Sequence, residues 1–189
     1  MNSFYPNDGH PLHPSPQSYT GRRARIAALC ILVILNGILL AAAGWKTGSN
    51  LPDLRKAGLD GGTAERLAGK VVLLDFWASW CSPCKASFPA LDSLQKKFSD
   101  KEFVILAINE DENPATMQAF LKEHPVNFTT VHDPGHKLVE LAAVDSMPTS
   151  FLIDTNGKIR FVHKGFHGEK TTALYEREIE MLLQEIRQP

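Results

Sequence analysis

The chain has 189 residues, with 20 basic and 21 acidic side chains and a formal net charge of −1. This length suits one ordinary domain with accessory segments, and a hydrophobic share of 43% is sufficient for a buried core. The balanced charge, without a basic stripe that interleaves aromatic residues, argues against a nucleic-acid partner. The 3 cysteines are too few for a disulfide scaffold.

The N-terminal segment indicates attachment to a membrane. Residues 1–25 are rich in Pro, Ser, Asn and His, and we expect a disordered cytoplasmic tail there. Residues 26–44 carry no charged side chain and would reach roughly 28 Å as a helix, close to the ~30 Å hydrocarbon core. They predict a single transmembrane signal anchor. Because Arg22, Arg23 and Arg25 precede it, the domain is expected on the periplasmic or extracytoplasmic side of the inner (cytoplasmic) membrane.

A removed signal peptide is the alternative to this anchor. The small residues at 41–43 resemble a cleavage site, whereas the long preceding tail favours a retained anchor. Cys30 lies within the apolar run, and Leu29 stands before it where lipid attachment requires a small residue. We therefore expect Cys30 to be a small apolar residue of the span. Export is expected under either alternative.

The remaining chain predicts an α/β sandwich with a mixed sheet. Residues 45–50 are expected to be a short linker, and 51–189 the folded domain. Buried strands are expected at 71–77 and 103–108 because both runs are apolar, the first apart from Asp75 and the second throughout. The other expected elements are helices at about 81–98, 114–123, 136–143 and 170–188, a short strand at 128–131, and a hairpin of 149–154 and 158–163.

Cys81 and Cys84 form a C-x-x-C motif at the expected start of a helix. Unpaired backbone N–H groups and the helix dipole stabilise a thiolate at that position, which makes Cys81 the expected nucleophile. Cys84, one turn further along, would then attack the mixed disulfide and release the reduced substrate. Pro83 stiffens the turn, and Trp80 offers a flat apolar surface to a docking peptide. Two inert thiols or half of a zinc site are the alternatives.

No metal site is expected, because a structural zinc site needs four ligands and the chain has no second cysteine pair. His163 and His167 lie four residues apart but flank a glycine at an expected strand end. Asp75 is an acid within a buried strand, so its pKa should be raised. It could exchange a proton with Cys84, or it could simply be satisfied by local hydrogen bonds.

The segment GKVVLLDFWASWCSPC at 69–84 resembles the TlpA/ResA group of membrane-anchored, extracytoplasmic thioredoxin-like proteins. The N-terminal anchor, the helix and strand between 114 and 131, and MPTSFLIDTNGK at 147–158 share this resemblance, which covers about 51–188. It implies a thioredoxin-like three-layer sandwich with a central mixed sheet, preceded by one transmembrane helix. It also implies no cofactor beyond a redox-active disulfide of Cys81 and Cys84.

The resemblance further implies roles for the loop at Met147 and Pro148. Only about 5–6% of X-Pro bonds are cis, so the residues alone predict a trans bond. In the family the matching proline is cis and faces the dithiol, while the residue before it pairs with bound substrate through its backbone. Family members usually reduce disulfides of exported proteins with electrons from a membrane-embedded donor, and cytochrome c maturation is a common task.

Three departures bear on that function. Asp75 stands where many members have Asn, Ala107 replaces the lysine that thioredoxin places near this acid, and the loop at 146–149 is Ser-Met-Pro-Thr instead of Gly-Ala-Pro-Glu. The last departure argues against a dedicated role in cytochrome c maturation. A thiol oxidant or isomerase, or a copper- or haem-handling module that uses the dithiol with His163, are the alternatives to a protein-disulfide reductase.

Overall fold

The computed structural model describes residues 44–57 and 66–187. The expected tail at 1–25 and nearly all of the expected transmembrane segment at 26–44 lie outside these residues. Within the described ranges, none of the helices combines the length and the apolar composition that crossing a membrane requires.

Five strands form one mixed sheet in the order β3-β2-β1-β4-β5. The central strand β1 (Val71–Trp77) pairs in parallel with β2 (Phe103–Asn109) and antiparallel with β4 (Thr149–Ile153). At the edges, β3 (Thr129–His132) runs parallel to β2, and β5 (Ile159–Lys164) runs antiparallel to β4. The predicted mixed sheet is therefore confirmed.

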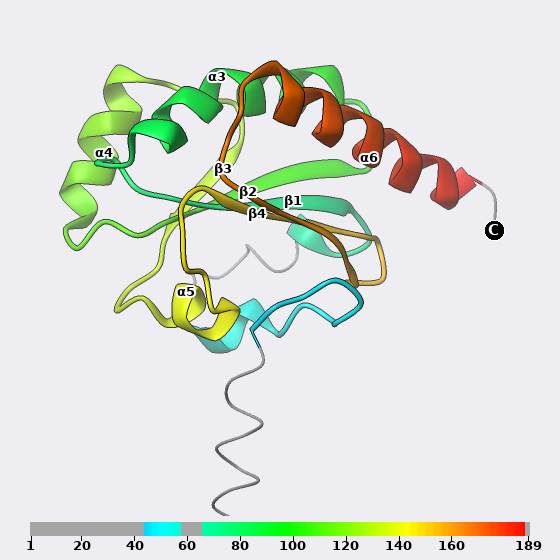
Figure 1. The fold of residues 1–189 in the computed structure, drawn as a ribbon, viewed down its shortest axis with the longest axis horizontal. Helices are drawn as coiled ribbons and strands as arrows, with labels where there is room; N and C mark the ends of the chain where they lie inside the picture. Colours follow the sequence, from blue (N-terminus) through cyan, green and yellow to red (C-terminus); the bar gives the residue numbers. More distant parts are fainter. Residues whose placement is uncertain (1–43, 58–65, 188–189) are drawn as a thin grey trace, which may run out of the picture. The chain divides into compact units, whose positions relative to one another are not determined.

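Helices cover both faces of this sheet, which gives three layers (Figure 1). The long helices α3 (Ser82–Lys97) and α6 (Glu169–Arg187), together with α4 (Pro114–Glu123), pack against one face. The short helix α5 (Lys137–Ala142) and the 3-10 turn η2 (Leu54–Ala57) lie on the other face. The thioredoxin-like α/β fold follows the order of elements that the sequence predicted.

Strand β1 divides the core because its side chains alternate between the two faces. All seven of its residues are buried. Leu73 and Trp77 belong to the cluster under α3 and α6, whereas Leu74 and Phe76 belong to the cluster on the side of α5. Asp75 shares the alternation of Leu73 and Trp77, so its carboxyl group faces the layer that contains α3.

Residues 45–50 lie on the domain, although the sequence suggested a linker. The Trp45 ring packs edge-on against Phe151, with ring centroids 5.3 Å apart. The Gly48 N–H donates to the carbonyl of Ile159 at 2.8 Å. The hydrophobicity of Trp45 and pairing with the start of β5 together explain why this segment packs against the sheet.

Candidate active site

The cysteine pair lies where β1 leads into α3. Cys81 is the N-cap of α3, and its Sγ accepts a hydrogen bond of 3.3 Å from the Cys84 N–H. The two residues form a disulfide, with Cα atoms 5.3 Å apart. Cys81 is 5% exposed and Cys84 is 0% exposed. The predicted arrangement is thus present: one sulfur lies at the helix N-terminus and the other is more deeply buried.

The helix begins here because the local sequence ends the strand and provides hydrogen-bond partners for the backbone groups of the turn. The Cys81 N–H donates to the carbonyl of Ala78 at 3.1 Å, and the Lys85 N–H donates to the carbonyl of Cys81 at 3.1 Å. Pro83 occupies the first turn, where its missing N–H removes no helical hydrogen bond. No acidic residue lies in this first turn. The dipole at the sulfur is therefore not offset by a nearby carboxylate on the same turn.

A hollow beside the cysteines brings together most of the predicted substrate-binding residues. Trp80, Pro83 and Met147 line it with Cys81, and Val139 of α5 also lines it. Trp80 is 66% exposed, which is unusual for so large an apolar side chain. The hollow therefore brings exposed apolar side chains beside Cys81.

The Met147–Pro148 peptide bond is cis. The resemblance predicted this geometry, whereas the frequency of X-Pro bonds alone predicted trans. The following carbonyl, that of Pro148, accepts a hydrogen bond from the Gly165 N–H at 2.8 Å, and the Thr149 hydroxyl donates to the carbonyl of Ser146 at 2.7 Å. The loop is therefore anchored on both sides of the proline.

Asp75 is almost fully buried, at 1% exposure. Its Oδ1 accepts a hydrogen bond of 2.5 Å from the Ser150 hydroxyl, and its Oδ2 has no hydrogen-bond partner among the described residues. Burial raises the pKa of Asp75 to about 7, and the Ser150 hydrogen bond opposes this rise. Ala107 lies directly across from Asp75 on β2, and the sequence comparison had this alanine in place of the lysine of thioredoxin. The predicted rise in pKa is confirmed.

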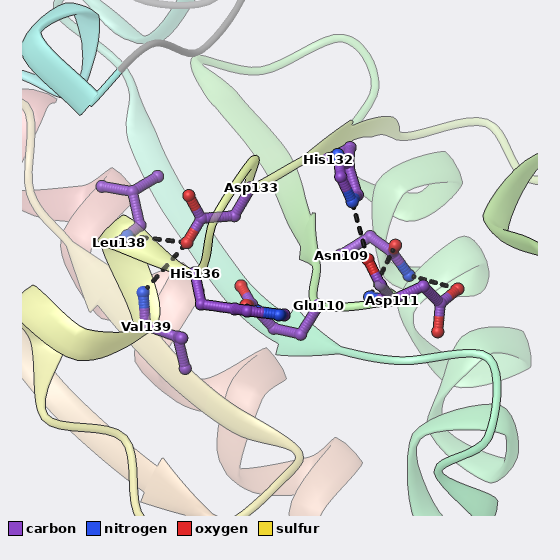
Figure 2. A network of polar contacts seen from close by, with 8 residues as sticks. All are labelled: Asn109, Glu110, Asp111, His132, Asp133, His136, Leu138 and Val139. Carbon is purple, nitrogen blue, oxygen red and sulfur yellow. Dashed lines mark hydrogen bonds and ion pairs between the residues drawn. The ribbon is translucent and has the colours of Figure 1, made fainter. Parts of the chain in front are cut away.

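A second polar cluster follows the end of β2 and was not predicted from the sequence (Figure 2). His136 Nδ1 lies 2.8 Å from Glu110 Oε2. Asp133 Oδ2 accepts hydrogen bonds from the Leu138 and Val139 N–H groups at 2.6 and 3.1 Å, which caps the start of α5. The cluster thus caps α5, whose Val139 lines the hollow beside the cysteines.

Electrostatics in this cluster are coupled. Burial raises the pKa of Glu110 to about 7, the hydrogen bond from His136 opposes the rise, and the nearby Asp133 adds to it. The same hydrogen bond to Glu110 raises the pKa of His136. The cluster holds acid and base side by side, so a proton can be exchanged within it.

Asp111 connects this cluster to the cysteine loop. Its Oδ1 accepts hydrogen bonds from both the N–H and the hydroxyl of Ser79, at 2.9 and 3.0 Å. Its Oδ2 accepts a hydrogen bond of 3.2 Å from the Asn109 side-chain amide, as Figure 2 shows. The sequence did hold one signal for this cluster, namely the polar residues that directly follow β2. Since the carboxyl ends of neighbouring parallel strands meet at one edge of the sheet, such residues are expected to lie close together.

His163, which the sequence offered as a possible metal or haem ligand, has a different partner. Its Nε2 lies 2.6 Å from Glu178 Oε2 on α6. In the part of the chain that the structure describes, no group of three or more His, Cys, Asp or Glu side chains is placed to hold a metal ion. The expectation that the protein needs no cofactor stays a prediction.

Comparison with known proteins agrees with this geometry. A model of the Redoxin family matches residues 46–179. The chain is 35% identical over 114 residues to thiol-disulfide oxidoreductase ResA from Bacillus cereus, a match that covers 59% of this chain and 66% of the relative. The chain thus spans slightly less than two thirds of that protein.

Two further matches extend over more of the fold. ResA from Bacillus subtilis is 32% identical over 138 residues, which cover 71% of this chain and 77% of the relative. The crystal structure of a candidate thiol:disulfide interchange protein DsbE from Chlorobium tepidum superposes with a TM-score of 0.66 at 37% identity, covering 74% of this chain and 99% of that one. The predicted resemblance to the ResA group is confirmed, and the chain belongs to the Redoxin family.

Proposed function

We propose that this protein is an extracytoplasmic thiol–disulfide oxidoreductase that reduces disulfides of exported proteins. The observation that carries the proposal is the position of Cys81 at the N-terminus of α3, with Cys84 buried one turn behind it. The relatives named thiol-disulfide oxidoreductase ResA support the same chemistry. Dithiol exchange needs no bound cofactor, because the two sulfurs themselves carry the electrons.

The reaction follows from the positions of the two sulfurs. The Cys81 thiolate attacks one sulfur of a substrate disulfide, that S–S bond breaks, and the other substrate sulfur leaves as a thiolate that takes up a proton. Cys84 then attacks Cys81 Sγ, closes the Cys81–Cys84 bond and releases the second substrate thiol. Two electrons pass to the substrate. A membrane-embedded thiol donor would return them by reducing the Cys81–Cys84 disulfide.

Asp75 serves as the base for the second step. Cys84 is fully buried, so its thiol needs a nearby acceptor to lose its proton before it attacks. The Asp75 carboxyl faces the layer that contains α3, and a pKa of about 7 suits proton exchange near neutral pH. Its Oδ2, which has no hydrogen-bond partner in the described part of the chain, is available for the proton.

Substrate binding is assigned to the hollow beside the cysteines. The exposed ring of Trp80 and the Pro83 and Met147 side chains present apolar surface to a docked peptide. The backbone at Met147, held by the cis bond to Pro148, would pair with the peptide main chain, as in the family that the sequence resembles.

Membrane anchoring is part of the proposal and rests on the sequence. The uncharged run at 26–44 is long enough to span a bilayer, and the arginines before it place the N-terminus in the cytoplasm. The chain from 45 onward would then lie across the inner membrane. Carbonate extraction of membranes, with protease access to intact spheroplasts, tests both the anchor and the side.

Reduction of insulin disulfides by the purified full chain tests the chemistry. Cys81→Ser should abolish turnover, and Cys84→Ala should trap mixed disulfides with exported proteins that appear on non-reducing gels. Cys30→Ser is the matched control and should keep full activity. Turnover by the Cys81→Ser protein, or a Cys84→Ala protein that traps no partner, would contradict the assignment.

The direction of electron flow follows from the reduction potential of the Cys81–Cys84 pair. Thioredoxin lies at about −270 mV and the strongest oxidants at about −120 mV. We expect a value below that of the glutathione pool, because the intervening Ser82-Pro83 resembles thioredoxin's Gly-Pro. Equilibration with glutathione measures it, and a potential well above the pool would favour the thiol oxidant or isomerase instead.

A further inference from the structure

A row of polar side chains crosses the sheet beneath α6. Asp75 on β1 lies directly across from Ser150 on β4, and Ser150 lies directly across from His163 on β5. Directly opposed residues on neighbouring strands point to the same face of a sheet. The three side chains therefore share the face that α3 and α6 cover, in a core that is otherwise mainly apolar.

Hydrogen bonds join this row to Tyr175 of α6. Ser150 Oγ lies 2.5 Å from Asp75 Oδ1 and 2.7 Å from Tyr175 Oη. An ionised carboxylate only accepts hydrogen bonds, and a serine hydroxyl has a single proton to donate. Ser150 must therefore donate to Asp75 and accept from Tyr175. Burial raises the pKa of Tyr175, which keeps its phenol protonated as the outer donor.

We propose that Ser150 and Tyr175 are positioning residues for Asp75: two hydroxyls in series hold Oδ1 and stabilise the carboxylate, which leaves Oδ2 to exchange a proton with Cys84. This inference rests on the proposed role of Asp75 as the base of the second step. The division of work between the two oxygens follows from their contacts, since Oδ1 has the serine and Oδ2 has no partner among the described residues.

The hydroxyl pair takes the place of a cation at this site. Ala107 is the neighbour of Asp75 on β2, and within the described chain the Ser150 hydrogen bond is what lowers the pKa of Asp75 against the effect of burial. Without that donated hydrogen bond, burial would act unopposed and the pKa of Asp75 would rise further. The proton would then leave the acid less readily near neutral pH.

The groups that face this site come from three elements. Tyr175 and Glu178 come from α6, His163 comes from β5, and Cys84 comes from α3, with Cys81 as the N-cap of that helix. His163 bonds Glu178 at 2.6 Å, and its ring lies edge-on to Tyr175 with centroids 5.1 Å apart. The His163 ring therefore packs against the ring of Tyr175, whose hydroxyl bonds Ser150.

Single-turnover reaction of the reduced full chain with 5,5′-dithiobis(2-nitrobenzoate) separates the two steps. A Cys30→Ser background leaves two reactive cysteines. The first nitrothiobenzoate released reports attack by Cys81, and the second reports attack by Cys84 on the mixed disulfide. The rate of the second release should rise with pH through an inflection near 7, the pKa of Asp75.

Ser150→Ala should move this inflection upward by about one pH unit, because a neutral hydrogen bond to a charged group is worth roughly that much. Tyr175→Phe should move the inflection in the same direction by less. Ser150→Thr should leave the inflection at its wild-type pH, because threonine keeps the hydroxyl. The first release should be unchanged in all three proteins. Ser93→Ala is the matched control, since the Ser93 hydroxyl bonds the Pro89 carbonyl on the exposed side of α3.

Carbon-13 NMR of the Asp75 carboxyl gives a second readout that does not depend on turnover. Ser150→Ala should raise the midpoint of its titration, and Ser93→Ala should not. An unshifted midpoint in Ser150→Ala would overturn the inference, even if Asp75→Asn abolishes the kinetic inflection and so upholds the proposed function. Should Asp75→Asn leave the kinetics unchanged, the role of Asp75 as a base fails, and the NMR midpoint alone still decides whether the hydroxyls tune it.

Discussion

Asp75 and Glu110 are two buried carboxyl groups with the same raised pKa, about 7, and very different neighbours. Asp75 lies within β1, and among the described residues its carboxyl bonds only a serine hydroxyl. Glu110 directly follows β2, bonds His136 and lies beside Asp133 (Figure 2). An acid whose hydrogen-bond partners are all neutral has no neighbouring base to take its proton. It is therefore available to exchange a proton with a cysteine thiol. An acid that has its own base can exchange a proton locally and is insulated from that chemistry.

Asp75→Asn should give the largest effect and sharpen this comparison. Because burial raises the folded pKa from 3.8 to about 7, the cost of ionising Asp75 is absent well below pH 3.8, grows as pH rises, and is fully present above pH 7. Stability should therefore fall as pH rises through this window, by on the order of 4 kcal/mol. Asn removes the charge, so urea unfolding of the oxidised variant should show much of this pH dependence lost.

The same variant should slow the attack by Cys84 while leaving the attack by Cys81 unchanged. Glu110→Gln is the matched control, because it removes an acid of similar pKa that has its own histidine. Equal losses of pH dependence in the two variants would show that the neighbours of a buried acid make no difference here, and the contrast drawn between the two sites would be lost.

Asp133 tests whether the second site serves the architecture of the hollow. Asp133→Ala removes the acceptor that caps α5, which should lower the free energy of unfolding by about 1–2 kcal/mol. Because Val139 of α5 lines the hollow, KM for a protein disulfide should rise while the rate with a small aromatic disulfide stays unchanged. Asp133→Asn keeps the capping oxygen and should behave like the wild type in both assays.

The difference in stability between Asp133→Ala and Asp133→Asn decides whether Asp133 acts through its hydrogen bonds or through its charge. If both variants lose stability equally, the charge of Asp133 matters more than its hydrogen bonds to α5. In that event the network beyond β2 would be an electrostatic site, as Asp75 is, and not a support for the substrate wall.

Local sequence was sufficient to predict most of the fold and the reactive sulfurs. Buried parallel strands have continuous apolar runs, and residues 71–77 form such a run. The Asn156-Gly157 pair predicted the hairpin, and Gly157 adopts a φ of 78° that this turn requires. Cys81 and Cys84 were found because a helix start and a cysteine spacing are both local features.

Features formed by distant residues could not be predicted from the sequence. Glu110 and His136 are 26 positions apart, and a run of acids after a strand predicts a solvated loop as readily as a buried network. Ser150 is 75 positions from Asp75, so their hydrogen bond depends on the register between β1 and β4. The cis bond at Pro148 was predicted by resemblance alone, because frequency favours trans.

His136→Gln should give the smallest effect and would most directly break the comparison. The hydrogen bond to Glu110 raises the pKa of His136 in the folded protein. The stability contributed by protonated His136 is therefore present below pH 6.5 and is lost as pH rises through this raised folded-state pKa. The His136 side chain is 40% exposed, and after allowance for solvent screening the loss at pH 6 should be about 0.5 kcal/mol or less. Unfolding at pH 6 and pH 9 measures this loss of stability, and the stabilities of the two proteins should converge at pH 9.

The pH profile of the Cys84 step in His136→Gln should stay as in the wild type, because Glu110 can remain protonated when its base is gone. A profile displaced as far as that of the Asp75 variants would mean that protons pass between the two buried acids, and the insulation of Glu110 by its histidine would then have to be abandoned.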